Sequence, residues 1–257
     1  MNCFLLVFLL VLSVIGVIVF LIVRFKYRRE RNLAYCLKEP IWRYDPIDSP
    51  MRIWCFWFGK EKMSEVRQKS LDLMKSSLGL PITIVNDGDI KKWLKWPVHP
   101  SVWDLSGIDR SDYFRIYFLY HYGGAYSDIK PHYTYSIKPY FKLLNQDPNM
   151  WVIGHREVKG GVITAPDYPC NLSRYYSDLI MQSQFIARPK NPLFEALHNE
   201  QNRVLTKHAS KLKSNPPPFE RCCFRHEGGY PLRWSELMGE VWCQEGIKYR
   251  NHIGHFP

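Results

Sequence analysis

Cysteine is scarce in this sequence, with seven residues among 257. That density excludes a small scaffold held together by disulfide bonds, and the odd number leaves at least one thiol unpaired within the chain. Acidic residues are also in the minority, because 24 Asp and Glu stand against 35 Lys and Arg, for a net charge of +11. This balance suits an anionic partner. No basic helix or recognised nucleic-acid module is present, so nucleic acid is not the expected partner.

Apolar residues, in contrast, are abundant. The hydrophobic fraction of 46% and the aromatic fraction of 15% exclude a disordered chain. Residues 3–23 contain no charge, and as a helix of ~32 Å this run is long enough to cross a bilayer. A cleaved signal peptide would need a basic start, a shorter apolar run and a small-residue cleavage site, none of which is present. We therefore predict that residues 1–31 form a single-pass transmembrane helix with a basic flank.

The side of the membrane stays open. The flank at 24–31 carries five Lys or Arg against one Glu, which by the positive-inside rule favours a cytoplasmic domain and also suits anionic lipid head groups. Asn171-Leu172-Ser173 is an N-glycosylation acceptor sequence, which favours a lumenal domain.

The remainder of the chain predicts one folded domain. Residues 32–50 contain three prolines and no periodicity, as in a stem or linker. From residue 51 onward, short apolar runs alternate with segments of helical spacing, and no internal repeat is visible. This alternation predicts an α/β domain with a mostly parallel sheet over residues 51–257. The strands are expected at 52–58, 81–86, 125–127, 151–154 and 181–187, and the helices at 61–78, 87–94, 109–122, 192–209 and 231–243.

One stretch combines residues suited to sugar chemistry. On the helix expected at 109–122, with Asp109 or Ser111 as its N-cap, Asp112 and Arg115 share one face. A carboxylate accepts hydrogen bonds from sugar hydroxyls, and a guanidinium donates to them. Gly123-Gly124 permits a sharp turn and a close approach of the backbone to a ligand. Asp128 then follows at the carboxyl end of a strand, where open α/β sheets bind ligands.

The joint spacing of this stretch resembles glycosyltransferase family 32, the DXD-containing sugar transferases. That family has the pattern Ser-Asp-x-x-Arg, a helix, then Gly-Gly-x-Tyr-x-Asp-x-Asp, and this sequence matches from Ser111 to Asp128 but has Lys130 at the last position. Weaker similarities extend the resemblance over residues 51–257. They are the strand and glycine at 53–59, the pair Asn86-Asp87, the segment 184–187 and, more loosely, the C-terminal residues 252–257.

The resemblance implies a GT-A-type, Rossmann-like domain that binds a nucleotide sugar. It also implies transfer of a hexose from a UDP- or GDP-sugar to a glycan, glycolipid or protein hydroxyl, with retention of configuration. Three sets of residues are implied: a catalytic pair (Asp128, Lys130), a donor-sugar set (Asp112, Arg115, Gln184) and a nucleotide set (Trp57, Asn86, Asp128, Gly124). The family habit, like the sequon at Asn171, favours the Golgi lumen over the cytoplasm.

Lys130 leaves the cofactor open, because in the family the second Asp binds Mn²⁺ or Mg²⁺ and a protonated amine cannot. Lys130 either faces the diphosphate in place of the metal, or points to solvent without a role. Alternatively, a metal remains on Asp128 with another ligand such as His255, or with His132 or His252. In a further alternative the site is inactive, and the protein is a nucleotide- or carbohydrate-binding membrane protein with a degraded DXD motif.

Overall fold

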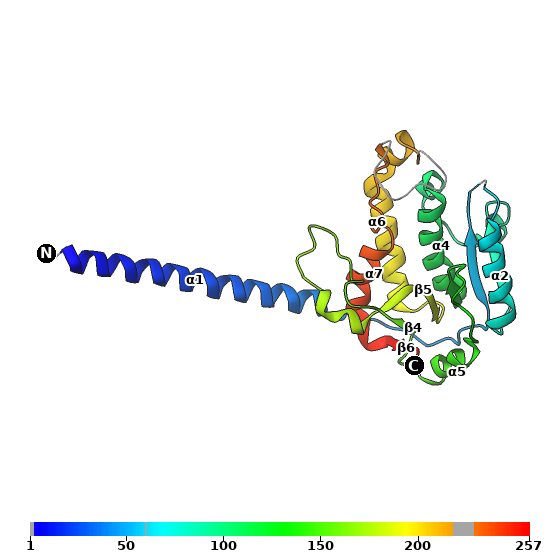
Figure 1. Cartoon of the computed structure of the whole chain (residues 1–257), viewed down its shortest axis with the longest axis horizontal. Helices are drawn as coiled ribbons and strands as arrows, with labels where there is room; N and C mark the ends of the chain where they lie inside the picture. The colour runs from blue at the N-terminus through cyan, green and yellow to red at the C-terminus, as the bar shows by residue number, and fades with distance from the viewer. Residues whose placement is uncertain (1–2, 60, 218–228) are drawn as a thin grey trace.

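The computed structural model describes residues 3–59, 61–217 and 229–257, without the side chains of residues 3–11. Its centre is a six-stranded sheet with the strand order β2-β1-β3-β5-β4-β6 (Figure 1). The strands are β1 (Ile53–Trp57), β2 (Ile82–Asn86), β3 (Gly124–Ser127), β4 (Val152–Arg156), β5 (Ile180–Ala187) and β6 (Ile253–His255). The predicted α/β class is confirmed. The sheet is mixed, however, because β5 runs antiparallel to both of its neighbours, β3 and β4.

Helices cover both faces of the sheet. The α-helices of the domain are α2 (Glu65–Ser77), α3 (Ile90–Trp93), α4 (Gly107–Tyr122), α5 (Lys138–Gln146), α6 (Pro192–Ser214) and α7 (Gly239–Gly246). Shorter 3-10 turns are η1 (Pro100–Asp104), η2 (Ser173–Asp178) and η4 (Ile247–His252). α5 lies in a segment for which the sequence predicted no helix. The paired cysteines Cys222-Cys223 lie outside the described residues.

The alternation of side chains along β1 separates two apolar layers. Trp54 and Phe56 point to the face covered by α4, α6 and α7, while Ile53 and Cys55 point to the face covered by α2 and α5. All four side chains are buried. This strand is therefore apolar throughout because both of its faces are covered, as is usual for a strand between parallel neighbours.

α4 begins earlier than the sequence predicted. Its N-cap is Ser106, whose hydroxyl accepts a hydrogen bond from the Asp109 backbone N–H at 3.1 Å, so neither Asp109 nor Ser111 is the cap. Asp109 instead accepts hydrogen bonds from Ser106 and Tyr230 at 2.6 and 2.7 Å. The helix ends at Gly123, as predicted. Gly123 has a φ of 65°, and an added Cβ there would lie 2.7 Å from Pro189.

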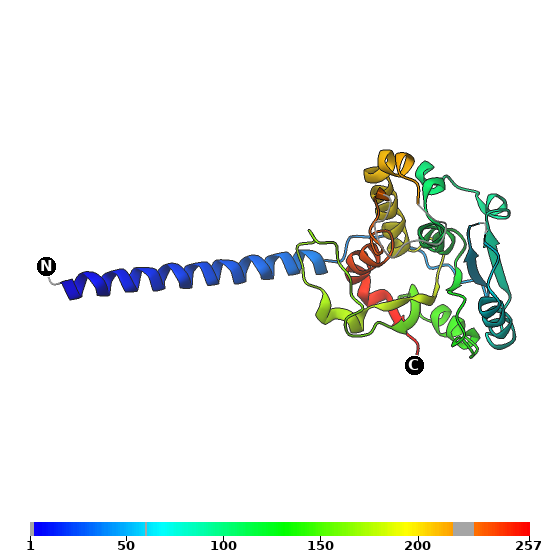
Figure 2. The ribbon, with the colours of Figure 1, turned by 45° about the horizontal axis from the view of Figure 1, so that its top comes forward.

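The N-terminal helix α1 (Cys3–Leu37) extends away from the domain in both views (Figures 1 and 2). It continues into the segment predicted as a stem, and a disulfide between Cys36 and Cys170 joins its end to the domain. The predicted membrane helix at 3–23 falls partly on side chains outside the described ones. Within the described part of the chain, no helix is both long and apolar enough to cross a membrane.

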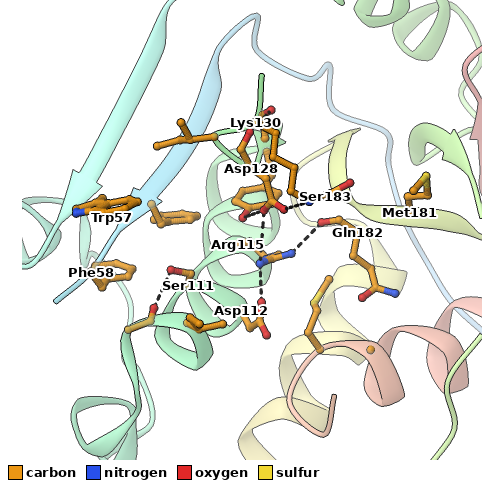
Figure 3. A pocket seen from close by; sticks show the side chains of 18 of the residues that line it. Trp57, Phe58, Ser111, Asp112, Arg115, Asp128, Lys130, Met181, Gln182 and Ser183 are labelled. Atoms are coloured by element: carbon orange, nitrogen blue, oxygen red, sulfur yellow. Dashed lines mark hydrogen bonds and ion pairs between the residues drawn. The ribbon is translucent and has the colours of Figure 1, made fainter. Parts of the chain in front are cut away.

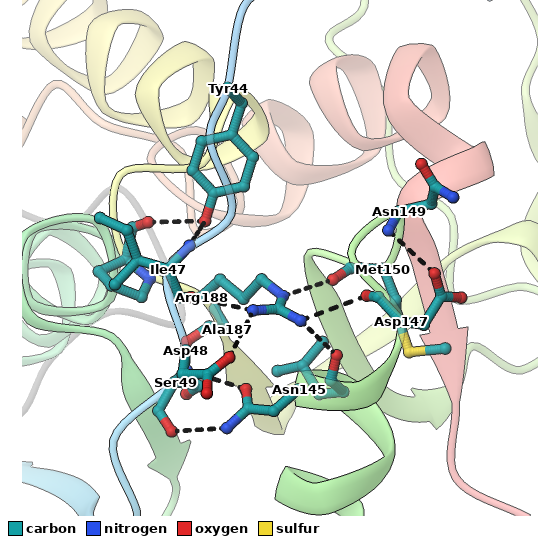
Figure 4. A network of polar contacts seen from close by, with 12 residues as sticks. Tyr44, Ile47, Asp48, Ser49, Asn145, Asp147, Asn149, Met150, Ala187 and Arg188 are labelled. Carbon is teal, nitrogen blue, oxygen red and sulfur yellow. Dashed lines mark hydrogen bonds and ion pairs between the residues drawn. The ribbon is translucent and has the colours of Figure 1, made fainter.

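A buried arginine attaches the linker to the sheet (Figure 4). The Arg188 guanidinium, 1% exposed, donates hydrogen bonds to backbone oxygens of the linker and of the stretch 144–150. These acceptors are Ile47 at 3.1 Å, Leu144 at 2.7 Å, Asp147 at 3.3 Å and Met150 at 3.0 Å. Nearby, the Ser49 hydroxyl donates to the Ala187 oxygen and accepts from the Gly124 N–H. The linker is thereby hydrogen-bonded to the end of the sheet at which β3 begins.

Candidate functional site

A cavity of about 940 Å³ opens where β1 and β3 end. Because β1 and β3 are parallel, their carboxyl ends lie at the same edge of the sheet. The cavity is lined by the ends of these strands, the first turn of α2, the first half of α4, part of β5 and the segment around the start of α7 (Figure 3). Its volume lies within the range of small-molecule sites.

Five residues predicted from the sequence line this cavity together: Trp57, Asp112, Arg115, Asp128 and Lys130. They come from β1, α4 and the segment that follows β3, and their side chains surround one space in Figure 3. The Trp57 indole N–H donates to the backbone oxygen of Glu61 at 2.9 Å, which fixes the ring at one end of the cavity. An aromatic ring and a charged cluster thus face the same space, a combination that suits a ligand with both a flat ring and anionic or hydroxylated parts.

Arg115 forms the centre of the charged cluster. Its Nη2 lies 2.5 Å from Asp112 Oδ1 and 4.0 Å from Asp128 Oδ1, and its Nη1 donates to the Gln182 backbone oxygen at 2.8 Å. The guanidinium carbon also lies 4.3 Å from the centre of the Tyr126 ring. The i, i+3 spacing predicted on α4 therefore does produce a carboxylate–guanidinium pair, and the segment after β3 adds the second carboxylate, Asp128.

The two carboxylates of the cluster have opposite pKa shifts. Burial raises the pKa of Asp112 to about 7, although the adjacent Arg115 lowers it. Burial also opposes ionisation of Asp128, but Arg115, Lys130 and the Tyr126 hydroxyl outweigh it and lower the pKa of that group. Asp128 is therefore a carboxylate at neutral pH, whereas Asp112 changes its charge near neutral pH. Such divergent environments are typical of functional sites.

Four other predicted residues do not line the cavity. Asn86 accepts hydrogen bonds from the Gly88 and Asp89 N–H groups, in the turn after β2. Gly124 is buried at the start of β3, where an added Cβ would lie 3.0 Å from the Arg52 backbone oxygen. Gln184 is fully buried and donates to the Ser127 hydroxyl at 3.1 Å. His255 lies on β6, with its Nε2 atom 3.3 Å from the Leu179 backbone oxygen.

The cavity also contains residues that sequence reasoning missed. Arg67 reaches it from α2, and its Nη1 donates to the Ile129 backbone oxygen at 2.5 Å. Gln182 and Ser183 reach it from β5, immediately before the predicted Gln184. No sequence signal pointed to Arg67, because α2 and the segment after β3 meet only in the tertiary structure.

The residues at the DXD position do not form a metal site. One oxygen of Asp128 accepts a hydrogen bond from Tyr126 at 2.5 Å, and the other lies 2.9 Å from the Lys130 amine. The predicted second ligand, His255, is not at the cavity. Within residues 3–59, 61–217 and 229–257, no three His, Cys, Asp or Glu side chains are grouped so that they could hold an ion. The donor set at Asp128 therefore does not fit a divalent cation, which prefers several oxygen ligands.

Part of the chain matches a known protein family. Residues 84–153 match the model of a family described as "Glycosyltransferase sugar-binding region containing DXD motif", a segment that includes Asp112, Arg115, Asp128 and Lys130. Among solved structures, the chain is similar to a "PaToxG Glycosyltransferase", with 14% sequence identity and a TM-score of 0.41. That similarity covers 86% of this chain and 76% of the other. No curated protein sequence matches the chain.

Proposed function

We propose that this chain, whose residues 84–153 match the model of the DXD-containing glycosyltransferase family, transfers a hexose from a UDP- or GDP-sugar to a hydroxyl acceptor, with retention of configuration. The acceptor would be a glycan, glycolipid or protein hydroxyl. The observation that carries the proposal is the meeting of Trp57 with the cluster of Asp112, Arg115 and Asp128 around one cavity. That cavity is large enough for a nucleotide sugar.

The residues around the cavity suit the parts of such a donor. The Trp57 ring offers a stacking surface for the base, and the paired Asp112 and Arg115 offer an acceptor and a donor for sugar hydroxyls. In the transfer, the bond between the anomeric carbon and the diphosphate oxygen breaks, with both electrons left on that oxygen. The acceptor oxygen bonds to the anomeric carbon, and its proton passes to the departing diphosphate. Positive charge beside the diphosphate stabilises this transition state.

The direct test is hydrolysis and transfer of common UDP- and GDP-sugars by the full-length chain. We expect turnover with one donor, and kcat/KM should rise with pH through about 7, the value to which burial raises the pKa of Asp112. Asp112→Asn should lose most of the turnover, and the kcat/KM of any residual activity should no longer rise with pH through about 7. Nucleotide binding without turnover of any donor would instead indicate the inactive, binding-only protein.

We also propose that the domain lies in an oxidising compartment, such as the Golgi lumen. The disulfide between Cys36 and Cys170 supports this location, because such bonds persist in the secretory pathway and not in the cytosol. The adjacent sequon supports it too, since Asn171 is exposed. These observations outweigh the basic flank at 24–31 in our proposal.

Membrane attachment through α1 completes the proposal. It rests on the uncharged run at 3–23 and on the exposure of the apolar side chains described from Leu12 onward. In cells of a secretory host, we expect the chain to resist carbonate extraction and to lose mass on deglycosylation unless Asn171→Gln is introduced. Release by carbonate would remove the anchor from the proposal, and an unglycosylated, fully reduced chain would contradict the lumenal location.

A further inference from the structure

We infer that Lys130 and Arg67 together bind the donor diphosphate and supply the positive charge that a divalent cation supplies in the family. This inference rests on the proposed function and concerns how that site holds its donor. Members of the DXD family typically use a divalent cation, so the assignment marks a departure of this chain from its family.

Lys130 lies in the cavity, with its amine 2.9 Å from Asp128 Oδ2 and its side chain 37% exposed (Figure 3). An ammonium group has three donors, and the carboxylate takes one of them. The others remain for an anion that enters the cavity.

Arg67 brings a second cation to the same place. It lines the cavity from α2, and its Nη1 donates to the backbone oxygen of Ile129, the residue between Asp128 and Lys130. This hydrogen bond keeps the guanidinium next to the segment that carries Lys130. No hydrogen bond of its Nη2 group is found within the described residues, and a guanidinium matches the geometry of phosphate oxygens.

The charges of the two side chains explain why a metal is not needed. A lysine and an arginine together carry two positive charges, as one divalent cation does. A metal ion on Asp128 would have to displace the Lys130 amine and would then lie beside two cations, which repel it. Asp128 thus positions Lys130 for the diphosphate in the same way that the family's carboxylate positions the ion.

The test is calorimetric binding of UDP, UMP, GDP and GMP to the full-length chain, in chelator and in Mn²⁺. For the wild type, the diphosphate should bind more tightly than the monophosphate, and equally well in chelator. Lys130→Ala and Arg67→Ala should each weaken diphosphate binding by about 10- to 100-fold, the value of one charged hydrogen bond, while monophosphate binding changes little. The exposed Lys138→Ala is the matched control and should leave both affinities unchanged.

Lys130→Asp sharpens the test, because it restores the second acid of the motif. Its diphosphate binding should be weak in chelator and should recover with Mn²⁺, and unchanged melting temperatures would show that the variants fold. Loss of wild-type diphosphate binding in chelator, or an undiminished affinity in Lys130→Ala, would overturn the inference while leaving the proposed transferase intact. Failure of the wild type to bind any nucleoside diphosphate would instead overturn the proposed function.

Discussion

Arg115→Lys is expected to lower kcat/KM for sugar transfer by about 100- to 1,000-fold, the range typical of a misplaced substrate-positioning group. Lysine keeps the positive charge but loses the planar fork that bonds Asp112 and the Gln182 backbone oxygen at the same time. It also loses the stacking of the guanidinium on Tyr126. The two carboxylates would then no longer be held at fixed positions around the donor sugar.

The measurement is steady-state transfer with the donor that the wild type uses, together with the melting temperature. Arg203→Lys is a matched control, since Arg203 lies on α6 and pairs with Glu200 on the surface, and it should keep wild-type activity. A fully active Arg115→Lys enzyme would show that this cluster does not handle the donor. If activity and melting temperature fall together to an unfolded chain, Asp112→Asn takes its place as the test.

Arg188→Met is expected to lower the free energy of unfolding by about 3–5 kcal/mol, the cost typical of removing one partner from a buried charged network. Methionine fills much of the space but leaves the backbone oxygens of Ile47, Leu144 and Met150 without their donor inside the protein. Buried acceptors without partners are the main source of the expected loss. The same linker is hydrogen-bonded to the start of β3, the strand that precedes Asp128. Transfer activity should therefore fall as well.

Urea unfolding of the full-length chain measures this loss. The control is Arg43→Met, an exposed arginine of the same linker, which should change the unfolding free energy by less than about 0.5 kcal/mol. A change for Arg188→Met as small as that of the control would show that water replaces the guanidinium at these oxygens and that the linker contributes little to stability.

Local spacing was sufficient to predict the central part of the site. Asp112 and Arg115 form a pair because three residues on a helix return to the same face, and Asp128 joins them because it follows a strand that ends at the same edge as β1. The predictions for Asn86, Gln184 and His255 depended on weaker similarities, and these side chains do not line the cavity. Their roles stay predictions.

The alternation of apolar segments along the chain determined the α/β class, the main strands and helices, and the helix that carries Asp112 and Arg115, because these features depend on neighbours in sequence. Contacts between distant segments were decided only by the tertiary structure. These include the antiparallel direction of β5, the disulfide between Cys36 and Cys170, and the hydrogen bond from Arg67 to the backbone oxygen of Ile129. Periodicity records which face of a segment is buried, but it carries no record of which segment lies against that face.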